Sequence, residues 1–280
     1  MVIDSIPKFV GMAYAIVATI MIVMMFRRGK FSMRIGYGFL VVSTLFGLLV
    51  FAPMLPLQFQ TVLLGDTKQL GVPIAFAIMV LVVFVVLAFA FGRAFCGHVC
   101  PIGAVQELAY LLPLKKLRIS SKAVPIAFRL AVFIAFLILA VAASIGMLKY
   151  LGVKDFFHLD FGAAFFYVFL TLLIISAFVY RPFCRFLCPY GVLLSIAAIK
   201  SRFRLQRNED CIDCGKCEEV CPTNEAGRTD LKQECYMCNR CKEACPSNAI
   251  VYVRKLTAVQ QGEPSPGLEP VSGGNRDGGS

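Results

Sequence analysis

Residues 211–222 read CIDCGKCEEVCP and residues 235–246 read CYMCNRCKEACP, so the pattern Cys-x2-Cys-x2-Cys-x3-Cys-Pro occurs twice in close succession. Bacterial proteins hold [4Fe–4S] clusters with this run, and the fourth cysteine of each run ligates the cluster of the other run. The short spacings allow three thiolates to surround one cluster from a single loop. The proline after the fourth cysteine prevents the loop from continuing as a helix. The spacing therefore predicts two [4Fe–4S] clusters.

The exchange of the fourth cysteine assigns the ligands of each cluster. Cluster A is predicted to be bound by Cys211, Cys214, Cys217 and Cys245. Cluster B is predicted to be bound by Cys235, Cys238, Cys241 and Cys221. A zinc site would use pairs of cysteines with a longer gap, and a disulfide framework would need an oxidising compartment. We therefore predict a small α+β ferredoxin domain with two clusters over residues 203–255, in which strand-like runs at residues 203–206 and 249–253 pair.

The rest of the chain is unusually apolar. Of its 280 residues, 58% are hydrophobic and only 16% are charged, whereas soluble domains are about 25% charged. Apolar runs of about 20 residues, the length that crosses a bilayer, predict about five spans: residues 6–26, 35–53, 73–92, 124–148 and 161–180. We predict a polytopic α-helical membrane domain over residues 1–202. The tail, residues 256–280, is rich in Gly, Pro and Ser and is predicted to be disordered.

The net charge of +11 comes mainly from basic residues that follow the first, third and fifth predicted spans. Loops rich in Lys and Arg lie on the cytoplasmic side of membranes. This places the N-terminus outside, the ferredoxin domain in the cytoplasm and the chain in the cytoplasmic (inner) membrane as a multi-pass protein. Nucleic-acid binding is disfavoured, because no basic segment outside the spans interleaves with stacking aromatic residues.

A shorter motif, R-x-F-C-x3-C-P-x-G, occurs at residues 93–103 and again at residues 181–191. Each copy follows an apolar span, and a single span separates the copies, so the two form a parallel internal repeat. The stretches after them, residues 104–118 and 192–204, are predicted to be helices lying under the membrane surface. Residues four apart share one helix face. The repeat should therefore bring four sulfurs to one membrane surface, those of Cys96, Cys100, Cys184 and Cys188.

Three interpretations of these four cysteines remain open. They could hold a further metal ion or cluster between the two halves, act as redox-active thiols or disulfides, or simply be small buried residues. The softness of thiolates favours iron–sulfur, copper(I) or zinc over hard cations. The two histidines, His98 and His158, lie on opposite faces of an apolar core about 30 Å thick, so they cannot ligate one haem together.

The double Cys-x3-Cys-Pro motif, joined to a C-terminal ferredoxin with two clusters, resembles the NapH/MauN-type membrane ferredoxins. These include the H-type quinol-oxidising subunit of periplasmic nitrate reductase systems. The chain is similar also to the C-terminal half of the nitrous-oxide reductase regulator. The resemblance covers roughly residues 73–255 and implies an inner-membrane subunit that passes electrons between the quinone pool and redox partners. The five predicted spans depart from the four that the H-type subunit usually has.

The expected function is therefore that of a membrane-bound iron–sulfur electron-transfer subunit of a respiratory-type oxidoreductase complex. It would relay electrons between the quinone pool or cytosolic donors and partner subunits such as haem or flavin proteins, and no residue is assigned a catalytic role. The alternative is an assembly or regulatory protein that uses its clusters and the four membrane-edge cysteines to reduce a metal or a disulfide in a partner enzyme. A transporter is disfavoured, because the spans carry almost no ionisable residues.

Overall fold

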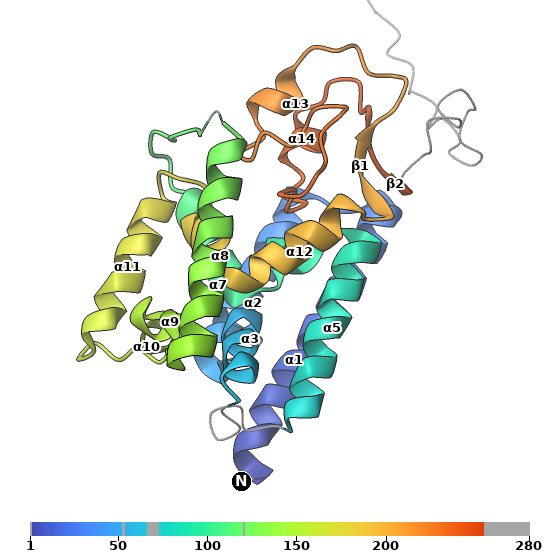
Figure 1. Ribbon diagram of the computed structural model, residues 1–280. Coiled ribbons are helices and arrows are strands. Elements are labelled where there is room, and N and C mark those ends of the chain that lie inside the picture. The colour runs from blue at the N-terminus through green and yellow to red at the C-terminus, as the bar shows by residue number, and fades with distance from the viewer. Residues whose placement is uncertain (1, 52–53, 66–72, 120, 255–280) are drawn as a thin grey trace, which may run out of the picture.

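The computed structural model describes residues 2–51, 54–65, 73–119 and 121–254, and leaves the side chains of residues 2–8 aside. The predicted tail lies outside the described residues. Four described helices are long and apolar enough to cross a membrane: α1 (Val2–Arg27, apolar over Phe9–Arg27), α2 (Met33–Val50), α5 (Ile74–Phe91) and α8 (Ala123–Ala143). These helices form one bundle (Figure 1). The first four predicted spans are thus long helices.

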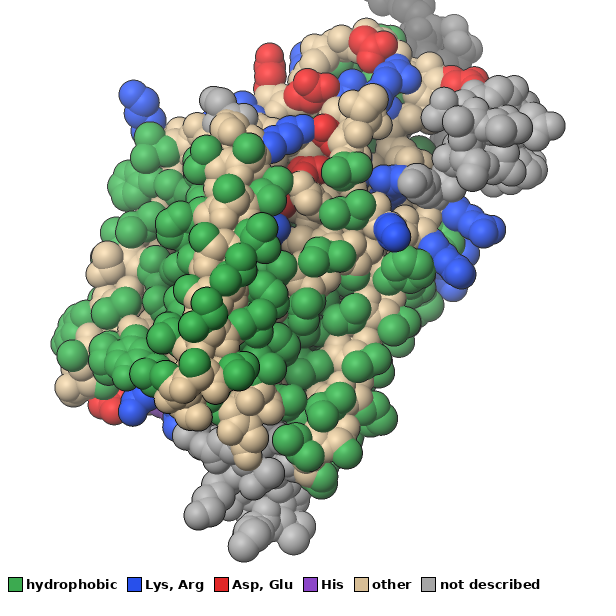
Figure 2. Space-filling view, in the orientation of Figure 1, with side chains coloured by type: hydrophobic (Ala, Val, Ile, Leu, Met, Phe, Trp, Pro, Cys, Tyr) green, Lys and Arg blue, Asp and Glu red, His purple; other side chains and the backbone are tan. Residues whose placement is uncertain are grey.

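The surface of the bundle is apolar. Val86 on α5 is 57% exposed and Val141 on α8 is 76% exposed. Figure 2 shows hydrophobic side chains over the middle of the molecule, with charged side chains gathered mainly toward the end that carries the C-terminal elements. An exposed apolar surface of this extent is typical of a membrane-embedded protein. The chain is a helical membrane protein with a small C-terminal α+β domain.

The fifth predicted span differs from the prediction. Instead of a helix over residues 161–180, the structure has α11 (Ala164–Ser176), which has 13 residues. A helix of that length rises about 20 Å, whereas the hydrocarbon core is about 30 Å thick. The residues after Ser176 leave the helix, and the Phe178 carbonyl accepts a hydrogen bond from the backbone N–H of Leu117. Short helices α9 (Met147–Tyr150) and α10 (Val153–Phe157) lie beside α11, and α3 (Leu55–Leu63) packs against α5.

The two copies of the repeat have the same architecture. The first contains α5, α6 (Ala94–His98) and α7 (Pro101–Tyr110); the second contains α11, the π-helical turn η1 (Phe183–Leu187) and α12 (Pro189–Ile199). The proline of each motif begins the following helix, where its missing N–H costs no hydrogen bond. Each residue of the first copy corresponds to the residue 88 positions later, as Cys96 does to Cys184.

Each copy of the repeat packs its last helix against the first helix of the other copy. Helix α12 of the second copy packs on α5 of the first, and α7 of the first copy packs on α11 of the second. The early residues of α7 and α12 are mostly buried. The two stretches that we expected to lie under the membrane surface therefore form helices that pack among the other helices of the bundle, because their apolar sides are covered by the opposite copy.

The C-terminal elements sit at one end of the bundle, next to the end of α5 (Figure 1). Strands β1 (Phe203–Arg207) and β2 (Ile250–Arg254) pair antiparallel, with Leu205 opposite Tyr252. The pairing of these two runs was predicted, without its direction or register. Between them lie the single turns α13 (Lys216–Glu219) and α14 (Arg240–Glu243), one in each cysteine run. The Tyr252 hydroxyl donates to the Phe91 carbonyl at 2.9 Å, which ties the strand pair to the end of α5.

Candidate iron–sulfur sites

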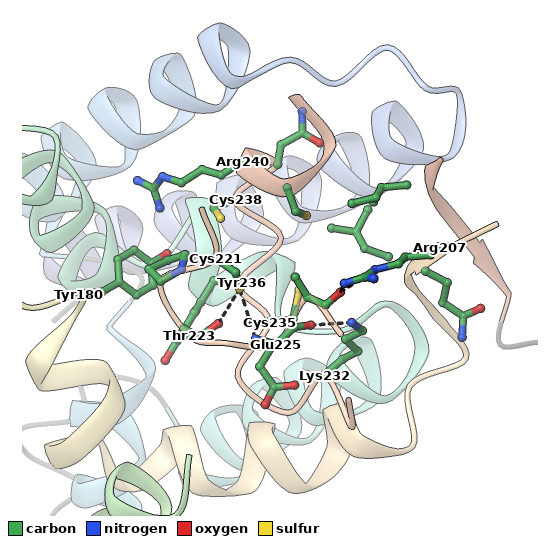
Figure 3. Close-up of a pocket in the computed structure, with 17 residues that line it drawn as sticks. Tyr180, Arg207, Cys221, Thr223, Glu225, Lys232, Cys235, Tyr236, Cys238 and Arg240 are labelled. Carbon is green, nitrogen blue, oxygen red and sulfur yellow. Dashed lines mark hydrogen bonds between the residues drawn. The ribbon is translucent and has the colours of Figure 1, made fainter. Parts of the chain in front are cut away.

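Two cavities of the C-terminal domain are each lined by four cysteines. One is lined by Cys235, Cys238 and Cys241 of the second run together with Cys221 of the first; we call it the second-run cavity (Figure 3). The other, the first-run cavity, is lined by the first three cysteines of the first run and the last cysteine of the second: Cys211, Cys214, Cys217 and Cys245. These are the same two groups that the exchange of the fourth cysteine predicts. Ligation of clusters by them stays a prediction.

The backbone explains how each loop encloses its cavity. Asp213 and Gly215 in the first run have positive φ angles of 48° and 74°. The residues at the same positions of the second run, Met237 and Asn239, have φ angles of 55° and 68°. The left-handed backbone conformation on both sides of the second cysteine turns the chain around the cavity. This conformation is most accessible to Gly, Asn and Asp. The same ligand loop is therefore built twice.

The two cavities differ in surroundings. Cys214 of the first-run cavity is exposed, whereas Tyr180 and Tyr236, both buried, line the second-run cavity. Burial raises the pKa of the Cys235 thiol to about 12. Such a thiol releases its proton when a metal replaces it, because metal binding requires the thiolate. The first-run cavity thus faces outward and the second-run cavity faces the membrane helices.

The four cysteines of the repeat line a third cavity, which we call the quartet cavity. Cys96 lies on α6 and Cys184 on η1, while Cys100 and Cys188 immediately precede α7 and α12, and all four are buried. Burial raises the pKa of the Cys184 thiol to about 11 and raises that of Cys100 as well. The structure therefore brings the four cysteines of both motifs to one enclosed place. Among the described residues, no three His, Cys, Asp or Glu side chains form a group that could hold one metal ion.

The histidines lie elsewhere. His98 is buried in a neighbouring small cavity, lined also by Gly36, Glu107 and Cys238. Burial lowers the pKa of the His98 imidazole to about 4, so the ring is neutral at pH 7. His158 stacks on Phe51, with ring centroids 4.3 Å apart.

Buried ion pairs join the membrane helices to the second run, and our sequence analysis missed them. Glu107 on α7 pairs with Arg181 at 2.7 Å and with Arg240 of the second run; we call this group the Glu107 triad. Glu234, next to Cys235, pairs with two arginines: Arg129 at 2.9 Å and Arg185 at 3.1 Å. This second group is the Glu234 triad. The Arg185 pair is also a hydrogen bond, while the Arg129 contact is an ion pair without hydrogen-bond alignment. Two signals were available in the sequence: the arginine that opens each repeat motif, and Arg129 inside the apolar run of residues 124–148.

Tyr236 lines the second-run cavity and lies against Arg93, which lines the quartet cavity. The guanidinium of Arg93 lies 4.5 Å from the centre of its ring and that of Arg181 lies 4.9 Å from it. Arg181 also donates to the carbonyls of Cys96 and Gly97. The backbone of the second run therefore lies directly against the first motif.

Gly97 is required for this approach. A Cβ atom at position 97 would lie 2.0 Å from the Tyr236 carbonyl oxygen, which is a backbone atom. We expect Gly97→Ala to displace the second run and to destabilise the protein by about 1–3 kcal/mol, the usual cost of overpacking. The measurement is thermal unfolding in detergent, together with hydrogen exchange of residues 235–245. Gly38→Ala is the matched control, because a Cβ there meets no atom within 4 Å; equal effects of both changes would contradict the contact.

Comparisons with known proteins agree with this layout. A family model described as "4Fe-4S binding domain" matches residues 72–120 and again residues 161–208, the two copies of the repeat. A second model with the same description matches residues 207–224, which contain the first cysteine run. No solved structure matches the chain.

Three curated relatives illustrate the similarity. The "Putative electron transport protein YccM" of Escherichia coli is 35% identical over 63% of this chain and 53% of its own length. The "Methylamine utilization ferredoxin-type protein MauN" of Methylobacillus flagellatus is 29% identical over 68% of this chain and 67% of its own. The "Regulatory protein NosR" of Pseudomonas aeruginosa is 33% identical over 46% of this chain and 20% of its own. The match thus spans about half of YccM and a fifth of NosR.

The chain is therefore a helical membrane protein with 4Fe–4S binding domains, related to iron–sulfur electron-transport proteins. It is homologous to MauN and to NosR, which confirms the predicted resemblance to the NapH/MauN-type membrane ferredoxins.

Proposed function

We propose that this protein relays single electrons through two iron–sulfur clusters of its C-terminal domain, from the outward face of that domain toward the membrane bundle, where the quartet cavity is a further redox site. The observation that carries the proposal is the order of the three cavities. The first-run cavity has an exposed cysteine, the second-run cavity is lined by Tyr236, and the quartet cavity is lined by Arg93, which lies against Tyr236. Clusters of this kind supply one-electron chemistry; the protein supplies the ligands, their spacing and the exclusion of water.

The assignment of ligands follows the cavities. Cluster A is proposed at the first-run cavity and cluster B at the second-run cavity, with the eight ligands assigned above. The proposed domain division is the predicted one, a membrane domain over residues 1–202 and a ferredoxin domain over residues 203–255. It is supported by the end of α12 at Ile199 and the start of β1 at Phe203.

The quinone pool is the proposed membrane partner. The position of the long apolar helix α2 supports it, because its Gly36 and Leu40 lie beside Cys238, a proposed ligand of cluster B, so a quinone in the membrane next to α2 would be near that cluster. The other proposed partners are haem or flavin subunits of a membrane complex. The basic residues after α1 and α5 support an orientation with the C-terminal domain in the cytoplasm.

A role in maturation, in which the quartet would reduce a disulfide of another protein, is less well supported. Thiol–disulfide exchange requires access of one sulfur to the other. All four cysteines of the quartet are buried, which favours an internal redox site over exchange with a partner.

The test is a count of iron and acid-labile sulfide on protein purified anaerobically in detergent, with EPR of the reduced form. Two [4Fe–4S] clusters predict about eight irons per chain and three predict about twelve. We expect the iron signals to be reduced by a quinol analogue or by a low-potential donor and to be reoxidised reversibly. Fewer than about eight irons, or iron that does not change oxidation state, would overturn the proposed relay.

A further inference from the structure

Arg93, the first residue of the first motif, lies in the wall of the quartet cavity and is only 2% exposed. Its guanidinium donates to the Ser195 hydroxyl at 3.0 Å and to the Gln233 carbonyl at 3.4 Å, and it lies against the ring of Tyr236. All these partners are neutral. Its Nε has no hydrogen-bond partner within the described part of the chain.

The other buried arginines around this place are paired with glutamate. Within residues 2–254 as described, Arg93 forms no ion pair, whereas Arg181 and Arg240 share Glu107, and Arg129 and Arg185 share Glu234. Glu234 also acts on Arg93, but this carboxylate already holds two arginines. This connected group of buried charges, as far as the structure describes it, therefore contains five arginines and two glutamates.

A buried excess of positive charge is costly unless an anion compensates it, because the charges have left water. Four neutral thiols would supply no negative charge, and neither would two disulfides. A group ligated by four thiolates is anionic, since each ligand has lost its proton. The quartet cavity is lined by four cysteines and by Arg93. An anionic group ligated by the four thiolates would therefore lie next to the one arginine of the five that has no carboxylate partner among the described residues.

We propose that Arg93 is the counter-charge of an anionic, thiolate-ligated iron–sulfur group held by the four quartet cysteines, Cys96, Cys100, Cys184 and Cys188. This inference rests on the proposed relay. It adds that the positive charge of Arg93 favours the reduced form of the group held by the quartet cysteines. A group held by the quartet cysteines would gain one negative charge on accepting an electron, and a group held at the second-run cavity would lose the same electron. Arg93 lies between the two sites and against Tyr236, so its positive charge stabilises the quartet after the electron has arrived.

The experiment compares Arg93→Gln, which removes the charge, with Arg93→Lys, which keeps it. Iron and zinc are counted per chain, and the EPR signals are titrated against potential. We expect about twelve irons in the wild-type protein. Arg93→Gln should either lose the quartet iron, leaving about eight, or shift its reduced-to-oxidised ratio at least tenfold toward the oxidised form, which is 59 mV for a one-electron couple. Arg93→Lys should restore most of the wild-type behaviour.

Arg202→Gln is the matched control, because it removes an exposed arginine that lies over Phe89 on the same side of the bundle; it should change neither the iron count nor the titration. About eight irons in the wild-type protein, with or without a zinc ion, would overturn the inference. So would twelve irons whose titration is the same in Arg93→Gln. If Arg93→Gln contained eight irons and unfolded at a higher temperature than the wild-type protein, the charge of Arg93 would be uncompensated. The four quartet cysteines would then be neutral, which also overturns the inference. In each of these outcomes the eight irons of clusters A and B report separately on the proposed relay.

Discussion

Replacement of Glu234 by alanine is expected to destabilise the protein by about 3–5 kcal/mol, the usual cost of removing one partner of a buried ion pair. Both arginines of the Glu234 triad would then be left without their carboxylate, and both are nearly inaccessible to water, Arg129 with 4% and Arg185 with 2% of the side chain exposed. Because Glu234 precedes Cys235, we also expect the second run to separate from the membrane helices. The measurements are thermal unfolding in detergent and proteolysis at residues 230–245.

The matched control is Arg228→Ala. Arg228 pairs with Asp213 in the same domain, but the two side chains are 49% and 64% exposed, and pairs of this kind contribute about 0–1 kcal/mol. A second comparison replaces the whole triad, with Glu234→Leu, Arg129→Met and Arg185→Leu in one protein. Apolar replacement of a complete buried triad is often neutral or stabilising, so stability should return. If Glu234→Ala behaves like Arg228→Ala, the triad does not hold the second run in place.

Replacement of Cys221 by alanine is expected to remove the cluster of the second run, although Cys221 belongs to the first run in sequence. The reason is that Cys221 lines the second-run cavity with Cys235, Cys238 and Cys241. About four irons per chain should be lost, the content of one [4Fe–4S] cluster. The EPR spectrum of Cys221→Ala should match that of Cys238→Ala, because both variants should retain only cluster A.

Cys214→Ala provides the comparison. This variant should lose cluster A and keep the EPR spectrum of cluster B, because Cys214 lines the first-run cavity. Cys245→Ala should match Cys214→Ala for the same reason. If Cys221→Ala instead gives the spectrum left by Cys214→Ala, each run binds its own cluster and the exchange of the fourth cysteine is wrong.

The elements that the sequence predicted well are those encoded by neighbouring residues. The apolar runs at α1, α2, α5 and α8 are continuous over the length of a bilayer, and the strand pair flanks the cysteine runs directly. The length of α11 was not predictable in this way. Residues 177–180 are as apolar as the helix before them, and they leave it because of contacts with residues near Leu117, far away in the sequence.

The buried arginines could not be found from sequence for a related reason. Arg181 and Arg185 follow a span, so the distribution of basic residues assigns them to a solvated loop. In the structure Arg181 is fully buried and pairs with Glu107, which is 74 positions away, and Arg185 pairs with Glu234, 49 positions away. Hydropathy reports the cost of burying a charge, but only the tertiary fold shows which carboxylate offsets that cost.

The exchange between the two copies of the repeat breaks a symmetry. The first arginine of each motif contacts a side chain of the other copy: Arg93 donates to Ser195, and Arg181 pairs with Glu107. Ser195 and Glu107 occupy equivalent positions of the two copies, 88 residues apart. Two identical copies would present two equivalent docking faces to the C-terminal domain, related by a half-turn about the axis between them. Since only one copy has a carboxylate at this position, and Arg240 of the second run binds that carboxylate, the domain can be seated in one orientation alone. A duplicated scaffold thereby acquires a single, non-repeated contact for the C-terminal domain.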